Sequence, residues 1–409
     1  MNILVINGDC IQTNSSANLC HLAYLRGLLA AGHQVTLLSA DGRDYTIDPA
    51  MTIPEQVMQY TIYGVSFYEK LSLRKRRNDI VLPSNMEASQ NPTSDGIAYK
   101  VITKIKSAVL ALYGVHGIYI TFVRKAQKFR LDEKFDYIIS ISTPVTSHLL
   151  THNLLKAGQI KGSHWIQIWE DPWYSDAYGF NGKEKIRREE KRLLAFAEKV
   201  CYVSPLTLEN QKKLFPEAAH KMFWQPLPFY YQCDKKCDFS VSGNNYGYFG
   251  DYAPIARDLE PFYIAAKKTG IRVNICGNPN NLFSSTEQIH VYPRLPLSEL
   301  KPIEDDTNVL VFLCNRKGGQ IPGKIYQYSA TNKTILFIMD GTEEEQRVLK
   351  EFFGKFNRYV FCKNTVEDIT IAIQKIENRM IGGIHNIPID EFDPVKIITN
   401  ILEAGRQMA

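Results

Sequence analysis

The sequence predicts an α/β protein built from two doubly wound, Rossmann-like halves. Short apolar segments typical of buried strands alternate with segments of helical periodicity almost throughout the 409 residues. A proline-rich stretch, WQPLPFYYQ, interrupts this alternation near residues 226–244, and the same pattern begins again after it. We therefore expect one domain over residues 1–226 and a second over 227–385. A last segment, 386–409, contains a helix that we expect to cross back onto the first domain.

The first half opens with a β-α-β unit. The apolar segment ILVING at residues 3–8 predicts a strand, and residues 19–31 have the pattern of a helix that Gly32 ends. A second strand is expected at residues 34–40. Residues 41–133 form a basic insertion without a clear period. After it we expect strands at 135–142, 163–171 and 200–204, and helices after Pro144, at 183–199 and at 207–215.

The second half repeats the alternation of strands and helices. In a doubly wound sheet, ligands bind at the carboxyl ends of the parallel strands, so the loops that follow the strands are the places to look for a site. Strands are expected at 245–251, 271–277, 289–292, 308–315, 334–340 and 358–362, and helices at 258–270, 321–332, 342–354 and 365–377.

Positive charge is concentrated in one segment. The net charge is +5, and residues 70–130 contain 12 Lys and Arg against 3 Asp and Glu. Two interpretations stay open: peripheral contact with an anionic membrane, or solvated helices over an ordinary core. Nucleic acid is not an expected partner, because no reader motif accompanies the charge. The first residues, MNILVINGD, resemble a strand and not a signal peptide, so we expect a cytoplasmic protein, peripheral to the inner face of the membrane if the first interpretation holds.

No metal or cofactor is expected. The 8 cysteines are scattered, and Cys233 and Cys237 do not have the spacing of a zinc-binding pair. The chain also contains no D-x-D sequence that would indicate a metal-bridged diphosphate.

The segment GGQIPGK, residues 318–324, is one residue short of a Walker-type phosphate loop. Such a loop needs Ser or Thr after its lysine to bind Mg²⁺, and Ile325 stands there, so an NTPase is not expected. A Gly-rich turn at a helix start can still attract a phosphate, and Lys324 adds a positive charge. Arg257 follows another strand of the same half. Arg and Lys on neighbouring loops can clamp a diphosphate.

The motifs of the second half resemble the donor domain of GT-B glycosyltransferases. They are G-x6-R-x-L-x-P-F, from Gly250 through Arg257 to Phe262, and I-P-G-K-I-Y-x-Y-x-A-x-x-K, from Ile321 to Lys333. In the first half, S-T-P at 142–144 and W-E-D-P-W at 169–173 are similar to stretches in the family 4 branch that builds bacterial surface polysaccharides.

The resemblance implies a GT-B architecture, in which two Rossmann-like domains face a central cleft. It also implies the transfer of a sugar, with retention at the anomeric carbon, from a nucleotide-diphosphate donor to a glycan or polyprenyl-linked acceptor. Arg257 and Lys324 would hold the diphosphate in place of a metal ion. The other implied donor contacts are Gly250, then Arg294 and Leu295 near the nucleobase, and Gln320, Ile321 and Gly323 near the phosphates or the sugar.

One departure from the family concerns its Glu-x7-Glu pattern, whose second Glu binds the donor ribose. The two positions are Gly319 and Gln327 in this chain. Gln327 can still hydrogen-bond ribose hydroxyls, but as a neutral group it would bind them more weakly. Gln320 or Asn315 is expected to replace the sugar contact of the first Glu.

Asp171 is the candidate catalytic base, or the anchor of the acceptor hydroxyl, because it directly follows a buried strand. The ordinary alternative is a turn cap before Pro172. Glu170 is expected to point toward the sheet or to bind a helix. Weaker candidates for sugar or acceptor contacts are Asn14, Ser15 and Ser16 in the loop above the first strand, and Trp173, which could equally belong to the core.

Two other functions remain alternatives. The replacement of both Glu positions, by Gly319 and Gln327, suggests a catalytically silent binding module of the same fold. A sugar-nucleotide epimerase would need acidic residues and a histidine grouped in the cleft, and the sequence alone does not locate such a group.

Overall fold

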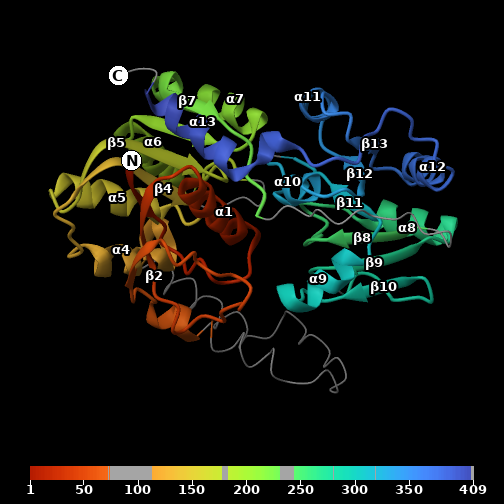
Figure 1. Ribbon diagram of the computed structural model, residues 1–409, viewed down its shortest axis with the longest axis horizontal. Helices are drawn as coiled ribbons and strands as arrows, with labels where there is room; N and C mark the ends of the chain where they lie inside the picture. The colour runs from red at the N-terminus through yellow and green to blue at the C-terminus, as the bar shows by residue number, and fades with distance from the viewer. Residues whose placement is uncertain are drawn as a thin grey trace.

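The computed structural model describes residues 1–71, 73, 113–176, 183–230, 244–279, 281–317 and 319–406. Most of the basic segment over 70–130, Cys233, Cys237 and the first glycine of GGQIPGK lie outside these ranges. The described residues form two parallel β-sheets that carry helices on their faces and lie side by side (Figure 1). This arrangement confirms the prediction of two Rossmann-like halves.

The first sheet has seven strands in the order β3-β2-β1-β4-β5-β6-β7, and all of its neighbouring strands are parallel. Its central strands are buried on both sides, which explains their continuous apolar sequences. The strands are β1 (Asn2–Ile6), β2 (Gln34–Ala40), β3 (Met58–Ile62), β4 (Lys134–Ser142), β5 (Lys161–Trp169), β6 (Lys199–Tyr202) and β7 (Met222–Trp224).

Helices connect these strands and cover the sheet. α1 begins after Ser15, whose hydroxyl accepts a hydrogen bond from the backbone N–H of Asn18 at 3.0 Å. The helices are α1 (Ser16–Ala30), α4 (Ile120–Ala126), α5 (Thr146–Lys156), α6 (Lys183–Phe196) and α7 (Pro205–Leu214), with 3₁₀ segments at Gly114–Tyr119 and Pro216–Lys221.

The second sheet has six parallel strands in the order β10-β9-β8-β11-β12-β13. Both sheets therefore have the strand order of a Rossmann fold. In this order, the strands are first added on one side of the first strand and then on its other side. The strands are β8 (Asn245–Phe249), β9 (Arg272–Cys276), β10 (Ile289–Tyr292), β11 (Val309–Leu313), β12 (Thr334–Met339) and β13 (Tyr359–Lys363). The helices are α8 (Glu260–Thr269), α9 (Leu297–Asp305), α10 (Lys324–Ser329), α11 (Glu343–Gly354) and α12 (Val366–Glu377).

Several elements were not predicted from the sequence, among them β3, α4, β7 and α9. β3 lies in the insertion and is mostly exposed, so it has no apolar run. β7 is only three residues long. α9 follows Pro296 and contains Pro302, and prolines are typical of loops.

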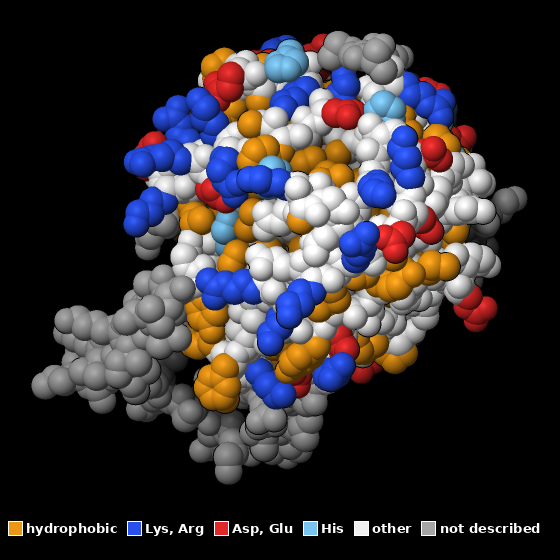
Figure 2. All heavy atoms as spheres, turned by 90° about the vertical axis from the view of Figure 1, so that its left-hand side faces the viewer, with side chains coloured by type: hydrophobic (Ala, Val, Ile, Leu, Met, Phe, Trp, Pro, Cys, Tyr) orange, Lys and Arg blue, Asp and Glu red, His pale blue; other side chains and the backbone are white. Residues whose placement is uncertain are grey.

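The outer face of the first half carries many positive charges. Figure 2 shows Lys and Arg side chains spread over this face among hydrophobic ones. Four of the exposed basic residues belong to α4 and the turn after it: Arg124, Lys125, Lys128 and Arg130. Among the described residues, no helix combines the length and the apolar character needed to cross a membrane.

The last helix, α13 (Pro394–Arg406), follows the 3₁₀ segment Asp390–Phe392 and lies on the first half beside α1 (Figure 1). The hydroxyl of Tyr137 on β4 donates to the carbonyl of Leu402 at 3.3 Å. The two helices approach closely at Gly27, where an added Cβ would lie 2.4 Å from the backbone oxygen of Pro394.

We expect Gly27→Ala to destabilise the protein by about 1–3 kcal/mol, because α13 would have to move away from α1. This cost outweighs the helix propensity that alanine gains over glycine. The exposed Gly382, where a Cβ would have nothing within 4 Å, provides the control Gly382→Ala. Urea unfolding of both variants measures the effect. Equal stability of the two would contradict the close packing of α13.

Candidate active site

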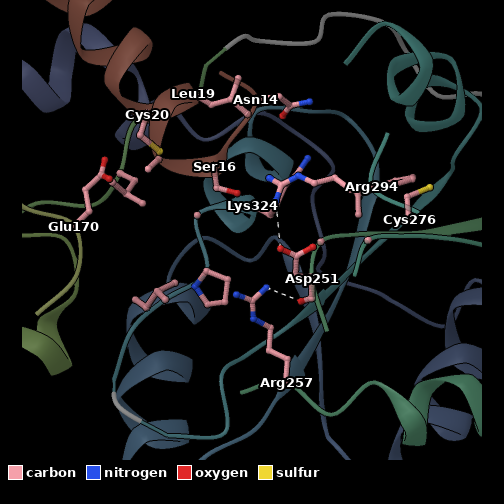
Figure 3. Close-up of a pocket in the computed structure, with 18 of the residues that line it drawn as sticks. Asn14, Ser16, Leu19, Cys20, Glu170, Asp251, Arg257, Cys276, Arg294 and Lys324 are labelled. Carbon is pink, nitrogen blue, oxygen red and sulfur yellow. Dashed lines mark hydrogen bonds and ion pairs between the residues drawn. The ribbon is translucent and has the colours of Figure 1, made fainter. Parts of the chain in front are cut away.

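A cavity of about 220 Å³ lies between the two sheets. Its walls come from loops that follow β1, β5 and β7 in the first half, and β8, β9, β10 and β11 in the second, together with the starts of α1 and α9. Every one of these loops leaves the carboxyl end of a parallel strand, as expected for a ligand site in this type of sheet. Figure 3 shows Glu170 and Cys20 on one side of the cavity and Arg257, Arg294 and Lys324 on the other.

Two arginines on the wall of the second half are held by their neighbours. The Nε of Arg257 donates to Asn315 Oδ1 at 2.8 Å, and its Nη1 donates to the carbonyl of Asp251 at 2.9 Å. Arg294 Nη1 lies 3.3 Å from the Asp251 carboxylate (Figure 3). These contacts orient both guanidinium groups before any ligand binds, which lowers the entropic cost of binding an anion.

Lys324, the third cation, pairs with Glu304 on α9 at 3.1 Å, and both side chains are largely buried. The end of α9 is fixed in turn by Lys333, whose ammonium donates to the carbonyls of Asp305 at 3.0 Å and Thr307 at 2.7 Å. α10, which begins at Lys324, has only six residues, so its dipole is small. The positive charge here therefore comes from side chains rather than from the start of the helix.

Asp171 is a polar group of the first half that contacts the second half directly. Its Oδ1 accepts a hydrogen bond from Gln320 Nε2 at 2.5 Å, which links the two halves across the cavity. The side chain is exposed to the cavity, but the surrounding protein displaces most of the bulk water. This desolvation raises the pKa of Asp171 to about 6, with a smaller contribution from the neighbouring Glu170, while Gln320 opposes the rise.

Glu170 lies on the same wall, where the sequence had suggested contact with the sheet or a helix. One of its oxygens is 3.2 Å from Nε2 of His21 on α1, so the contact with a helix exists. The side chain nevertheless borders the cavity. The sequence gives little sign that both Glu170 and Asp171 border the cavity. Adjacent residues of a strand point to opposite faces of the sheet, so only one of the two side chains would be expected there.

The cavity brings together most of the candidate residues. Asn14 Nδ2 donates to the carbonyl of Leu295 at 3.4 Å, so the loop after β1 touches the loop after β10 across the two halves. The roles of the candidate residues in binding remain predictions. The candidates that line the cavity are Asn14, Ser16, Asp171, Gly250, Arg257, Arg294, Leu295, Gln320, Ile321, Gly323 and Lys324.

Three candidates lie elsewhere. Ser15 does not line the cavity and caps α1. Trp173 belongs to the core of the first half, where its ring lies 5.2 Å from that of His116 and its backbone N–H faces Glu190 at 3.4 Å. Gln327 uses its Oε1 to accept the backbone N–H of Tyr230 at 2.8 Å, so it ties α10 to the segment that leaves the first half.

The sequence analysis did not single out Asp251, although the residue directly follows Gly250 at the end of β8. With it, the cavity is lined by three cations and three carboxylates. The charges are unevenly placed, because the cations all belong to the second half, whereas two of the three acids, Glu170 and Asp171, belong to the first. One wall therefore suits a phosphate and the other suits hydroxyl groups.

Within the described ranges, no group of three or more His, Cys, Asp or Glu side chains is arranged to hold a metal ion.

Solved structures that are similar to this chain over nearly its whole length include a synthase and a galactosyltransferase. Sucrose-phosphate synthase from Thermosynechococcus elongatus has a TM-score of 0.54 and 12% identity, and the match covers 100% of this chain and 97% of that one. The apo form of the lipopolysaccharide outer core galactosyltransferase WaaB has a TM-score of 0.51 and 10% identity, covering 99% of each chain. No protein-family model matches the sequence, and no curated protein matches it either. The structural likeness confirms the GT-B architecture, with two Rossmann-like domains.

The raised pKa of Asp171 predicts a dependence of stability on pH. Because the folded protein binds this proton more tightly than the unfolded chain does, the ionised carboxylate lowers the stability above pH 6, and the penalty disappears as the pH falls toward 3.8. We expect Asp171→Asn, which keeps an acceptor for Gln320, to raise the free energy of unfolding at pH 7.5 and to have little effect at pH 4.

Urea unfolding at the two pH values measures this difference. Asp132→Asn serves as a control, because the Asp132 side chain is 82% exposed and its substitution should change the stability by less than about 0.5 kcal/mol. A loss of stability in Asp171→Asn at pH 7.5 would show that the carboxylate is held by favourable contacts.

Proposed function

We propose that this chain is a glycosyltransferase that moves a sugar from a nucleotide-diphosphate donor to a glycan or lipid-linked acceptor. The observation that carries the proposal is the cavity between the two halves, with Arg257, Arg294 and Lys324 on one wall and Asp171 on the other. A nucleotide sugar has the matching division of charge, since its diphosphate is anionic and its sugar is neutral. The GT-B fold supports the same conclusion.

The diphosphate is the leaving group of the reaction, and the cations stabilise it. As the glycosidic bond breaks, negative charge grows on the phosphate oxygen that departs. Arg257 and Lys324 neutralise this charge without a metal ion, and Arg294 lies toward the nucleobase. A diphosphate competes with Glu304 for Lys324, so part of the attraction is spent in separating that ion pair.

Asp171 accepts the proton of the acceptor hydroxyl or holds that hydroxyl in place. A carboxylate with a pKa of about 6 is mostly ionised at neutral pH, and so it can accept a hydrogen bond. In the present arrangement the Asp171 carboxylate already accepts from Gln320, so an acceptor hydroxyl would share or replace this contact. We assign the chain to the retaining enzymes of family 4 and to surface polysaccharide synthesis on its sequence motifs.

A lipid-linked acceptor would bring the enzyme to a membrane. The exposed basic residues of α4 and its following turn, Arg124, Lys125, Lys128 and Arg130, support this part of the proposal, because such clusters attract anionic lipids.

A sugar-nucleotide epimerase is the second candidate. Such an enzyme needs acidic groups and a histidine close together. Glu170 and Asp171 lie on one wall of the cavity, and His21 contacts Glu170 from α1. His21 does not itself line the cavity. Incubation with a panel of nucleotide sugars separates the two functions: an epimerase changes the sugar while it stays attached to the nucleotide, whereas a transferase releases a nucleoside diphosphate.

We expect Arg257→Ala and Lys324→Ala each to weaken the binding of UDP or GDP by roughly tenfold or more, because each removes a charged contact worth about 1.5–3 kcal/mol. Isothermal titration calorimetry measures the affinities. Glu304→Gln is the matched control, since it removes the acid that competes for Lys324. Its affinity should stay the same or rise. Unchanged binding in both cation variants would exclude this position for the diphosphate.

Metal removal provides a separate test. Since Arg257 and Lys324 replace a bridging metal ion in this proposal, EDTA should leave donor hydrolysis and transfer unchanged. Adding Mg²⁺ or Mn²⁺ to the chelated enzyme should have no effect either. Activity that disappears with EDTA and returns with a divalent ion would contradict the metal-independent mechanism.

A further inference from the structure

A second carboxylate, Glu170, lines the cavity and has one buried oxygen that is unsatisfied. The residue is 8% exposed, and its side chain lines the wall of the first half beside Cys20 (Figure 3). Oε1 has no hydrogen-bond partner among the residues that the structure describes. A buried carboxylate oxygen without a partner is costly, so a donor that reached this atom from the cavity would be stabilising.

The other oxygen of Glu170 is held in place. Oε2 lies 3.2 Å from His21 Nε2, and the imidazole is 2% exposed. His21 Nδ1 lies between two amides, 3.1 Å from Asn18 Oδ1 and 3.3 Å from Asn7 Nδ2. Asn7 also donates to the carbonyl of Ile141 at 3.2 Å, which anchors the group to β4. The chain of contacts therefore fixes the direction of Glu170 before a ligand arrives.

The surroundings indicate the chemistry of the missing donor. Glu170 and Asp171 are adjacent on this wall, and together they repel a phosphate. The cations that attract phosphate lie on the opposite wall. An ionised carboxylate accepts hydrogen bonds only, so its partner must be an uncharged donor or a cation. A sugar hydroxyl is an uncharged hydrogen-bond donor, and a sugar lies next to the diphosphate in a bound nucleotide sugar.

We propose that Glu170 Oε1 accepts a hydrogen bond from a sugar hydroxyl and that His21 acts as the positioning residue for this carboxylate. The inference rests on the proposed function, because it assumes that a sugar occupies the cavity. The hydroxyl belongs either to the sugar of the donor or to the acceptor, and the two sources are separated by experiment.

The main variant is Glu170→Gln, which keeps the shape of the side chain and removes its charge. Calorimetry compares UDP and GDP, which lack a sugar beyond the diphosphate, with UDP-glucose and GDP-mannose. If Glu170 contacts the donor sugar, the variant should bind the accepted nucleotide sugar about five- to tenfold more weakly, and the free nucleotide with unchanged affinity.

If Glu170 contacts the acceptor, both affinities should stay unchanged. The KM for an alkyl glycoside, tested as octyl glucoside and octyl galactoside, should then rise by a similar factor. Glu198→Gln is the matched control, because Glu198 forms an exposed pair with His164 at 2.9 Å and does not line the cavity. This variant should behave as the wild type in every assay.

His21 is tested by conservative rescue. His21→Gln can still donate to Glu170, whereas His21→Leu cannot, so the leucine variant should reproduce the weaker sugar binding of Glu170→Gln and the glutamine variant should not. A purely structural role of His21 would instead impair nucleotide and nucleotide-sugar binding equally.

The outcomes are distinguishable. If the wild type binds nucleotide sugars and Glu170→Gln binds them equally and has the wild-type KM for both glycosides, the oxygen faces only ordered water and the Glu170 proposal is wrong. If the wild type binds none of the four nucleotides, the proposed function fails, and the role of Glu170 fails with it.

Discussion

The structure depends on one geometric constraint, which is that the carboxyl edges of two parallel sheets face each other. Each loop of the cavity leaves such an edge, so polar residues that are up to about 300 positions apart in the sequence meet in one place. The two walls differ in charge because they come from different sheets. Neither half alone could place a cationic clamp opposite carboxylates, and this opposition is the property from which the proposed chemistry follows.

The contacts between the halves also explain why Gly319, in the loop before α10, stands where the Glu-x7-Glu pattern has its first glutamate. The carbonyl of Gly319 accepts from Ser204 Oγ at 2.6 Å, which holds the loop against the start of α7. Gly319 has φ +70°, and a Cβ there would lie 2.9 Å from the side chain of Leu206. A glutamate at this position would be strained and would also clash with α7. The glycine is therefore a packing requirement, and any acid that contacts the ligand must come from another element, such as the loop after β5.

Sequence patterns predicted the strands and the loops after them well, because buried parallel strands are continuous apolar runs with little ambiguity. Arg257 and Lys324 could be found for the same reason, since each follows such a run. The patterns could not predict which side chains turn toward the cavity. Gln327 was predicted to contact a ligand, and its Oε1 accepts the backbone N–H of Tyr230. Glu170 was predicted to point toward the sheet or to bind a helix, and it contacts a histidine on α1 while it also borders the cavity. These outcomes depend on contacts between segments far apart in the chain, about which a local period carries no information.

The return of α13 to the first sheet has a mechanical consequence. The polypeptide passes between the two domains twice, once after β7 and once before α13, and both passages are covalent. The two passages touch, because the backbone N–H of Phe229 donates to the carbonyl of Phe392 at 3.1 Å, so rotation about this contact is expected to be the softest motion between the domains. A domain movement that admits substrate would therefore be a hinge opening. It would widen the cavity between the two domains and leave the α1–α13 contact intact.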